Sequence, residues 1–331
     1  MKSSSNKKKG FGNESKKKRN ANSHELILEQ QALDLIKKGK SKEAEEIYLK
    51  LIKLNTKNHH IYGNLAALYG MKGNKSEMYK FLIKAIEIEP NYSEAHNNLG
   101  NYFSNKGDYD QAIREYKYAI SIKKDYFDPY YNIGNTLISK SKFSDAIAFL
   151  KEGLKLKKDD LNTLNSLAIA LKEKGDLLTS VKYFKKAIEI NNESPDIINN
   201  LGTTYHLLGN LDLAKNCFNT AIELDPNFPE AHSNLGLILQ EEKKYEDAIN
   251  SFKRSLKLCS DFSVAANNLA ITYMFINDLN NAYKFFKKAI DIKPDYPNTY
   301  FNLGNLYETK GDLLKAIFYF KKAIQLNPNY F

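Results

Sequence analysis

The stretch EAHNNLGNYFSNKGDYDQAIREYKYAI, residues 94–120, decides the fold, because the chain repeats its pattern at a fixed interval. The stretch EAHSNLGLILQEEKKYEDAINSFKRSL, residues 230–256, has the same pattern four periods of 34 residues further on. A fixed period of this length is the signature of a repeat array. Nine units fill the span from Glu25 to Tyr330 without a gap: 25–58, 59–92, 93–126, 127–160, 161–194, 195–228, 229–262, 263–296 and 297–330.

Small and large side chains recur at fixed positions, which are numbered 1 to 34 within each unit. Position 8 is Gly or Ala in all nine units, and position 24 is always large, as in Gly100 with Tyr116 and Gly236 with Phe252. Apolar positions 4, 7, 8 and 11 form one helical stripe, and positions 17, 20, 21, 24, 27 and 28 form a second. Small residues let two helices approach closely, and the large residue fills the gap beside them. The pattern therefore predicts two packed helices in each unit.

Glycines and prolines mark where these helices begin and end. Position 15 is Gly in six units and is often followed by Asp or Asn, which is a helix-stop and turn signal. All eight prolines lie at positions 1, 3 or 32, where a missing backbone N–H does not break a helix. The sequence thus predicts an all-α fold of nine helix–turn–helix units.

The two quoted stretches resemble the tetratricopeptide repeat family nearly residue for residue, and the resemblance covers residues 25–330. It implies a right-handed α-solenoid superhelix, in which the first helix of each unit lines the concave inner face and the second lies outside. It also implies a protein–protein interaction scaffold or adaptor rather than an enzyme.

Asparagine recurs where the family resemblance puts the inner face, at positions 2, 5, 6, 9, 12 and 13. A side-chain amide donates and accepts hydrogen bonds, so a column of amides could pair with a peptide backbone of any sequence. The column is similar to that in the repeat arm of O-linked N-acetylglucosamine transferases. The alternative is that each amide bonds a neighbouring helix. The candidate peptide-groove residues are Asn64, Asn98, Asn132, Asn200, Asn234, Asn268 and Asn302 at position 6, and Asn101, Asn135 and Asn305 at position 9.

The expected inner face is acidic, although the chain carries a net charge of +10. Its lysines are Lys37 and Lys172 only. Four of its acids lie at position 2, where the helix dipole also favours them. We expect the groove to prefer neutral or basic protein segments. The acids are Glu29, Glu94, Asp128, Glu173, Asp196, Glu230, Glu241 and Glu308.

No catalytic constellation is apparent. The sequence has no phosphate loop, GxGxxG, HExxH or GxSxG motif, and none of the six histidines has a second ligand at metal spacing. Cys217 and Cys259 are 42 residues apart and fit neither a disulfide framework nor a zinc site. We therefore expect no catalytic residue, no metal, no cofactor and a cytoplasmic location.

The two ends differ from the body of the chain. Residues 1–24 hold seven lysines, one arginine and a single acid, which predicts a disordered basic leader and makes it the one region suited to contact nucleic acid. No apolar run is long enough to span a membrane. The last unit lacks a polar cap, so we expect Phe320 and Ile324 to be partly exposed. That face could self-associate, or the natural protein could continue into another domain.

Three functions remain open at this level. The first is a scaffold that binds extended protein segments in the groove. The second is the substrate-recruiting arm of a larger enzyme, for example a glycosyltransferase, whose catalytic domain is absent here. The third is an RNA- or ribosome-linked factor that acts through the basic leader.

Overall fold

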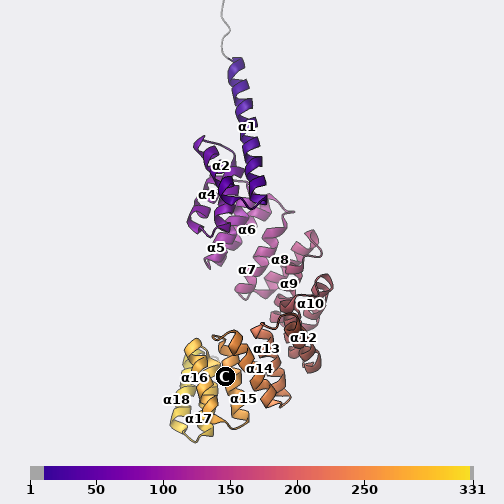
Figure 1. Ribbon diagram of the computed structural model, residues 1–331, viewed down its shortest axis with the longest axis vertical. Coiled ribbons are helices and arrows are strands. Elements are labelled where there is room, and N and C mark those ends of the chain that lie inside the picture. The colour runs from indigo at the N-terminus through magenta and orange to yellow at the C-terminus, as the bar shows by residue number, and fades with distance from the viewer. Residues whose placement is uncertain (1–10, 329–331) are drawn as a thin grey trace, which may run out of the picture. The chain divides into compact units, whose positions relative to one another are not determined.

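The computed structural model describes residues 11–328, and its helices come in pairs (Figure 1). The chain divides into two compact units, residues 1–158 and 159–331. The helices of the first unit are α1 (Phe11–Lys37), α2 (Ser41–Lys53), α3 (His59–Met71), α4 (Lys75–Ile88), α5 (Ser93–Asn105), α6 (Tyr109–Ile122), α7 (Phe127–Ser139) and α8 (Phe143–Leu156).

The second unit continues the same alternation of helices. Its helices are α9 (Leu161–Lys174), α10 (Leu177–Ile190), α11 (Pro195–Leu207), α12 (Leu211–Leu224), α13 (Pro229–Glu241), α14 (Tyr245–Leu258), α15 (Ser263–Phe275), α16 (Leu279–Ile292), α17 (Pro297–Thr309) and α18 (Leu313–Leu326). Among residues 11–328 the structure thus has nine helix pairs and no strand, so the predicted all-α repeat fold is confirmed.

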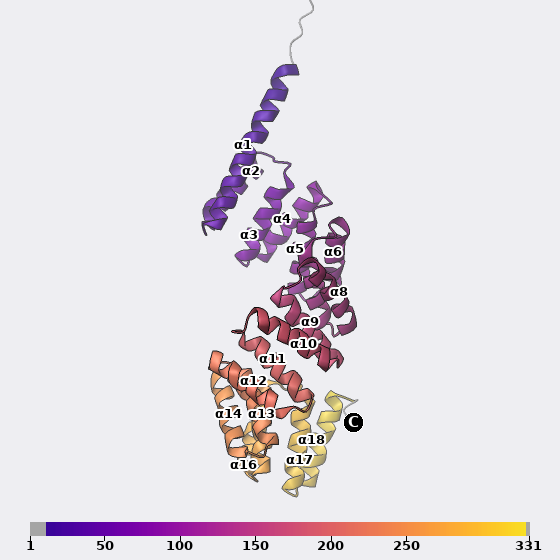
Figure 2. The ribbon, with the colours of Figure 1, turned by 90° about the vertical axis from the view of Figure 1, so that its right-hand side faces the viewer.

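Helix α1 is longer than the repeat predicts. Its second half packs on the core through Leu28, Ala32 and Leu35. The helix begins already at Phe11 (Figure 2), so residues 11–24 are helical where their composition predicts disorder. Once the packed half is formed, each further residue adds a backbone hydrogen bond without a new nucleation cost. The prediction for residues 1–10 lies outside the described residues.

The two helices of a pair approach closely because position 8 carries little or no side chain. A Cβ atom built on Gly100 would lie 2.5 Å from the ring of Tyr116, and one on Gly202 would lie 2.7 Å from Phe218. Both rings are buried. The predicted pairing of a small residue with a large one therefore forms the interior of each repeat.

The turn between the two helices has one conformation throughout. Position 15 has a positive φ in all nine repeats, whether the residue is one of the six glycines or Ser141, Lys243 or Asn277. Position 16 then caps the second helix where it is Asp or Asn, as in Asp108, whose carboxylate accepts the N–H of Gln111 at 3.1 Å. Lys142 at the same position provides no side-chain cap.

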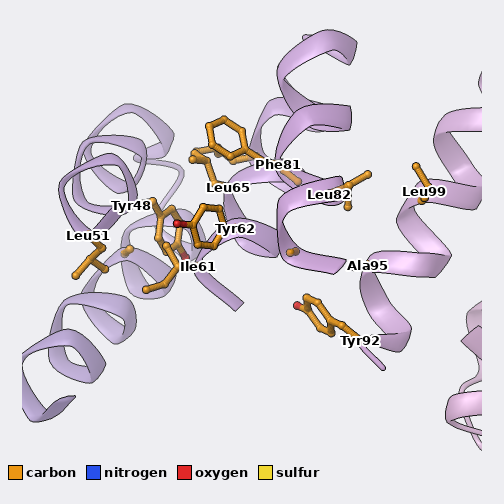
Figure 3. Close-up of a cluster of buried hydrophobic side chains, with 14 of the residues drawn as sticks. Tyr48, Leu51, Ile61, Tyr62, Leu65, Phe81, Leu82, Tyr92, Ala95 and Leu99 are labelled. Carbon is orange, nitrogen blue, oxygen red and sulfur yellow. The ribbon is translucent and has the colours of Figure 1, made fainter. Parts of the chain in front are cut away.

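The core of the first unit runs from repeat to repeat. Figure 3 shows Tyr48 and Leu51 of α2, Ile61 and Tyr62 of α3, and Phe81 of α4 in one cluster of buried side chains. Within each unit, neighbouring first helices from α3 onward contact each other directly, as α3 does α5 and α11 does α13. Contacts of that extent between neighbouring second helices are absent from the described residues. The first helices therefore lie on the inner side of the stack.

The last helix exposes part of its apolar face. Ile324 is 40% exposed, whereas Phe320 is half-buried. Leu314 and Phe318 are more open, at 84% and 62%. The exposure expected of this face is present, and self-association through it stays a prediction.

Candidate peptide-binding surface

Within each unit, the predicted asparagines lie on the first helices of the repeats. We call this the A-helix surface: positions 2, 5, 6, 9, 12 and 13 on the first helix of each repeat. In the first unit α3, α5 and α7 carry the asparagines, and in the second unit α11, α13, α15 and α17 do. All ten predicted residues are half-buried, so each amide is held by its helix while part of it stays accessible.

Three of the ten amides bond the preceding repeat. Asn132 Nδ2 donates to Asn97 Oδ1 at 2.9 Å. The same bond recurs from Asn234 to Asn199 at 2.9 Å and from Asn302 to Asn267 at 3.1 Å. The acceptors Asn97, Asn199 and Asn267 are buried at position 5. These three acceptors were not among the predicted site residues, although a 35-residue spacing between asparagines would have revealed them.

These bonds orient the amides and leave some of their hydrogen-bond donors and acceptors unused by the bond. A carboxamide has two N–H donors and a carbonyl oxygen with two lone pairs. The bond to Asn97 uses one N–H of Asn132 and fixes which end of its amide is nitrogen. The carbonyl oxygen of Asn132 is not used in that bond. For these three residues the structure thus has the bond to a neighbouring helix that was the alternative to a peptide-binding role.

The bond requires an asparagine at position 5 of the preceding repeat. Position 5 of the preceding repeat is Gly63 for Asn98 and Glu29 for Asn64, so neither asparagine forms the bond. Asn200 follows Asn165, whose Oδ1 is buried without a hydrogen-bond partner. The column therefore contains asparagines with a bond to the preceding repeat and asparagines without one.

A polar pocket of about 310 Å³ opens on the A-helix surface of the first unit. Tyr116 Oη donates to Asn101 Oδ1 at 2.7 Å, and burial raises the pKa of Tyr116 to about 12, so its hydroxyl is neutral near pH 7. No lining residue is charged, which suits neutral polar groups such as backbone amides. The lining residues are Asn101, Ser104, Asn105, Tyr116, Asn132, Asn135, Thr136 and Ser139.

Acidic residues of the A-helix surface in the second unit are partly engaged by neighbours. Glu173 forms an ion pair with Lys172 at 3.3 Å on α9. Glu241 of α13 accepts a hydrogen bond from His206 of α11, with Nε2 and Oε1 2.7 Å apart. The negative charge that a ligand meets is therefore smaller than the count of acids indicates.

Reactive groups are not assembled in the described part of the chain. No group of three or more His, Cys, Asp or Glu residues there is placed to hold a metal ion. Burial raises the pKa of Cys217 to about 11, which keeps it a thiol. No helix among the described residues is long and apolar enough to cross a membrane.

Within each unit, the helix pairs stack through contacts between a small and a large residue, and they present one continuous set of side chains. This arrangement defines the class of protein, an α-solenoid of the kind that serves as a scaffold. Models of the tetratricopeptide repeat match this chain over most of its length, and the chain belongs to the tetratricopeptide repeat family, whose repeats build protein-interaction scaffolds. No curated protein matches the sequence. The matched segments are residues 59–92, 81–114, 101–137, 127–160, 161–194, 183–216, 202–243, 229–262, 276–311 and 297–330.

Solved structures share the fold at low sequence identity. The APC/C heterotetramer Cut9–Hcn1 matches with a TM-score of 0.61 and 16% identity over 90% of this chain, which spans 55% of that one. A tetratricopeptide repeat protein from Parabacteroides merdae matches with a TM-score of 0.62 and 17% identity, over 72% of this chain and 94% of the other. Human IFIT1, solved as a dimer with m7Gppp-AAAA, has a TM-score of 0.59 and 19% identity, covering 91% and 77%. At these identities the likeness concerns the fold alone.

Proposed function

We propose that this protein is a scaffold that binds extended protein segments on its A-helix surface, through the asparagine column. The observation that supports this most is the uncharged polar pocket lined by Asn101, Asn132 and Asn135. A site without charge and rich in amides favours a ligand with both hydrogen-bond donors and acceptors, and a peptide backbone offers one of each at every residue.

The spacing of the column also suits an extended chain. Packed helices lie roughly 8–10 Å apart. An extended peptide advances about 3.3 Å per residue. Successive position-6 amides therefore meet about every third residue of a bound segment. The bond from Asn132 to Asn97 holds one amide in place before the peptide arrives, which lowers the entropy lost on binding.

Charge then selects among peptides. Acids outnumber lysines on the A-helix surface by eight to two. Basic segments are attracted to such a surface, acidic ones are repelled, and neutral ones are not discriminated against by charge. The similarity of the column to the repeat arm of O-linked N-acetylglucosamine transferases stays a prediction.

The test removes amides of the column that do not link repeats, so that the stacking of the repeats is left intact. The variant N98A/N135A/N200A removes three asparagines whose side chains make no bond to the preceding repeat. We expect its affinity for fluorescein-labelled 12-residue neutral and basic peptides, measured by fluorescence anisotropy, to fall at least tenfold. Each lost hydrogen bond contributes about 0.5–1.5 kcal/mol. Thermal unfolding should change little.

A matched control makes the same change elsewhere. The variant N216A/N250A/N280A removes exposed asparagines from the second helices α12, α14 and α16. It should bind the peptides as the unsubstituted protein does. If N98A/N135A/N200A bound them equally well, the column would not be the binding element.

A further inference from the structure

A second candidate site lies among the second helices of the first two repeats. It is an apolar pocket of about 760 Å³, within the size range of ligand pockets. It shares no residue with the A-helix surface, and its residues all belong to the first unit. Leu49 and Ile52 come from α2, Tyr62 from α3, and Tyr79, Lys80, Phe81, Ile83, Lys84 and Glu87 from α4.

The apolar walls depart from the pattern of the other repeats. Position 25 is Leu49 in the first repeat and Ile83 in the second. Because the other seven repeats carry a polar residue at this position, the stacking of repeats does not need an apolar one. The two apolar residues belong to adjacent repeats and line the same pocket. The polar residues at position 25 are Lys117, Lys151, Lys185, Asn219, Lys253, Lys287 and Lys321.

Aromatic rings form a fixed part of the pocket. Phe81 is 7% exposed and stacks on Tyr69, with ring centroids 5.6 Å apart and an interplanar angle of 4°. The rings of Tyr62 on α3 and Phe81 on α4 are also neighbours, with centroids 6.5 Å apart, and Figure 3 shows both side chains. A pocket built on packed rings is formed before a ligand binds, which favours insertion of an apolar side chain.

The surroundings of the pocket are basic. Lys80 and Lys84 line it, and each forms an ion pair on its own helix, Lys84 with Glu87 at 2.9 Å and Lys80 with Glu77 at 3.3 Å. Lys50 and Lys53 follow Leu49 and Ile52 in the last turn of α2. The lining itself thus carries two lysines and one acid, and these lysines are the charged groups that an acidic segment would meet beside the apolar walls.

We propose that this pocket docks an amphipathic segment of a partner protein, with apolar side chains that enter the pocket and acidic residues that meet the lysines. A groove with apolar anchors and complementary charge is the usual arrangement for such a segment. A second copy of this chain fits less well. The exposed apolar residues Leu314 and Phe318 lie on α18 beside Lys315, Lys321 and Lys322, which would bring like charges together.

The decisive variant gives the first two repeats the residue that is commonest at position 25. L49K/I83K should fold, because six other repeats carry Lys there. The probe is a fluorescein-labelled 14-residue helical peptide with leucines on one face and glutamates on the flanks, measured by fluorescence anisotropy. We expect the variant to bind it at least tenfold more weakly. L178K, which makes the same kind of change at an exposed leucine of α10, should bind it normally.

A second variant leaves the apolar walls intact. K80E/K84E should weaken binding of the glutamate peptide and strengthen binding of a peptide with lysines in place of its glutamates. N98A/N135A/N200A should bind the glutamate peptide unchanged, which separates this site from the A-helix surface. Equal affinity of L49K/I83K and the unsubstituted protein would overturn the proposal. The proposal would also be overturned if the unsubstituted protein formed a dimer in light scattering, or bound phosphatidylcholine vesicles, and only L49K/I83K abolished this.

Discussion

Single residues decide how closely the two helices of a repeat approach. At Gly134, an added Cβ would lie 2.4 Å from Cγ and Cδ2 of Leu150, which is fully buried. At Gly153, in the last turn of α8, the nearest atom would be Tyr130 Cβ at 3.4 Å, an ordinary contact distance. The same substitution should therefore have opposite effects at two glycines that are 19 positions apart in the sequence.

We predict that Gly134→Ala destabilises the protein and Gly153→Ala stabilises it. Overpacking a close contact costs about 1–3 kcal/mol, more than the roughly 1 kcal/mol that alanine gains over glycine inside a helix. Gly153→Ala should bring the gain in helix stability without the cost of overpacking. Most other repeats already have Ala at this position. Urea unfolding followed by circular dichroism checks both. Equal shifts in one direction would show that the glycines do not differ in packing.

Asparagine at position 6 shows that a residue's role depends on its neighbour. Asn302 bonds Asn267, whereas Asn98 has Gly63 in the corresponding place and lacks such a bond. The residue type at one position therefore predicts the surface but not the contact. Two positions, 35 residues apart, must be read together.

Among the elements, some turns between helices are less stable than their sequence positions allow. The α7–α8 turn has Ser141 with a φ of 55° followed by Lys142, which does not cap. The α5–α6 turn has Gly107 with a φ of 80° followed by Asp108, which does. A left-handed conformation costs a residue other than glycine about 1–2 kcal/mol, and a missing cap costs about 0.5–2 kcal/mol.

We predict that S141G/K142D stabilises the protein by about 1–2 kcal/mol, after subtracting the larger unfolded-state entropy of glycine. The carboxylate should accept an N–H at the start of α8, as Asp108 does for α6. G107A/D108A should shift the urea midpoint in the opposite direction. A midpoint of S141G/K142D at or below that of the unsubstituted chain would contradict the prediction.

The helices could be predicted from the sequence because the repeat gives nine readings of each position. Gly39 and Gly209 mark turns that the structure places at those residues. The start of α1 at Phe11 could not be predicted in this way, since it precedes the first repeat. The apolar pocket was also not predicted. Leu49 and Ile83 are ordinary residues by themselves, and only their shared position among lysines distinguishes them.

At the scale of the chain, contacts are local. Within each unit, every substantial contact between the described helices joins helices no more than two apart in chain order. Stability in such a stack is approximately a sum of repeat and nearest-neighbour contributions. The repeats are also divided between two compact units, residues 1–158 and 159–331. A local defect should therefore not spread evenly.

This locality gives a prediction that hydrogen exchange can test. Gly134→Ala weakens the α7–α8 pair, so amides of α7 and α8 should exchange faster, by roughly 5–30-fold for a loss of 1–2 kcal/mol. Amides of α5 and α6, which stack on that pair, should exchange moderately faster. Those of α2 should keep their rates, because among the described helices of the first unit no substantial contact links α2 to α7 or α8. A uniform acceleration over all helices would mean that the chain opens as one cooperative unit, and the nearest-neighbour account would then fail.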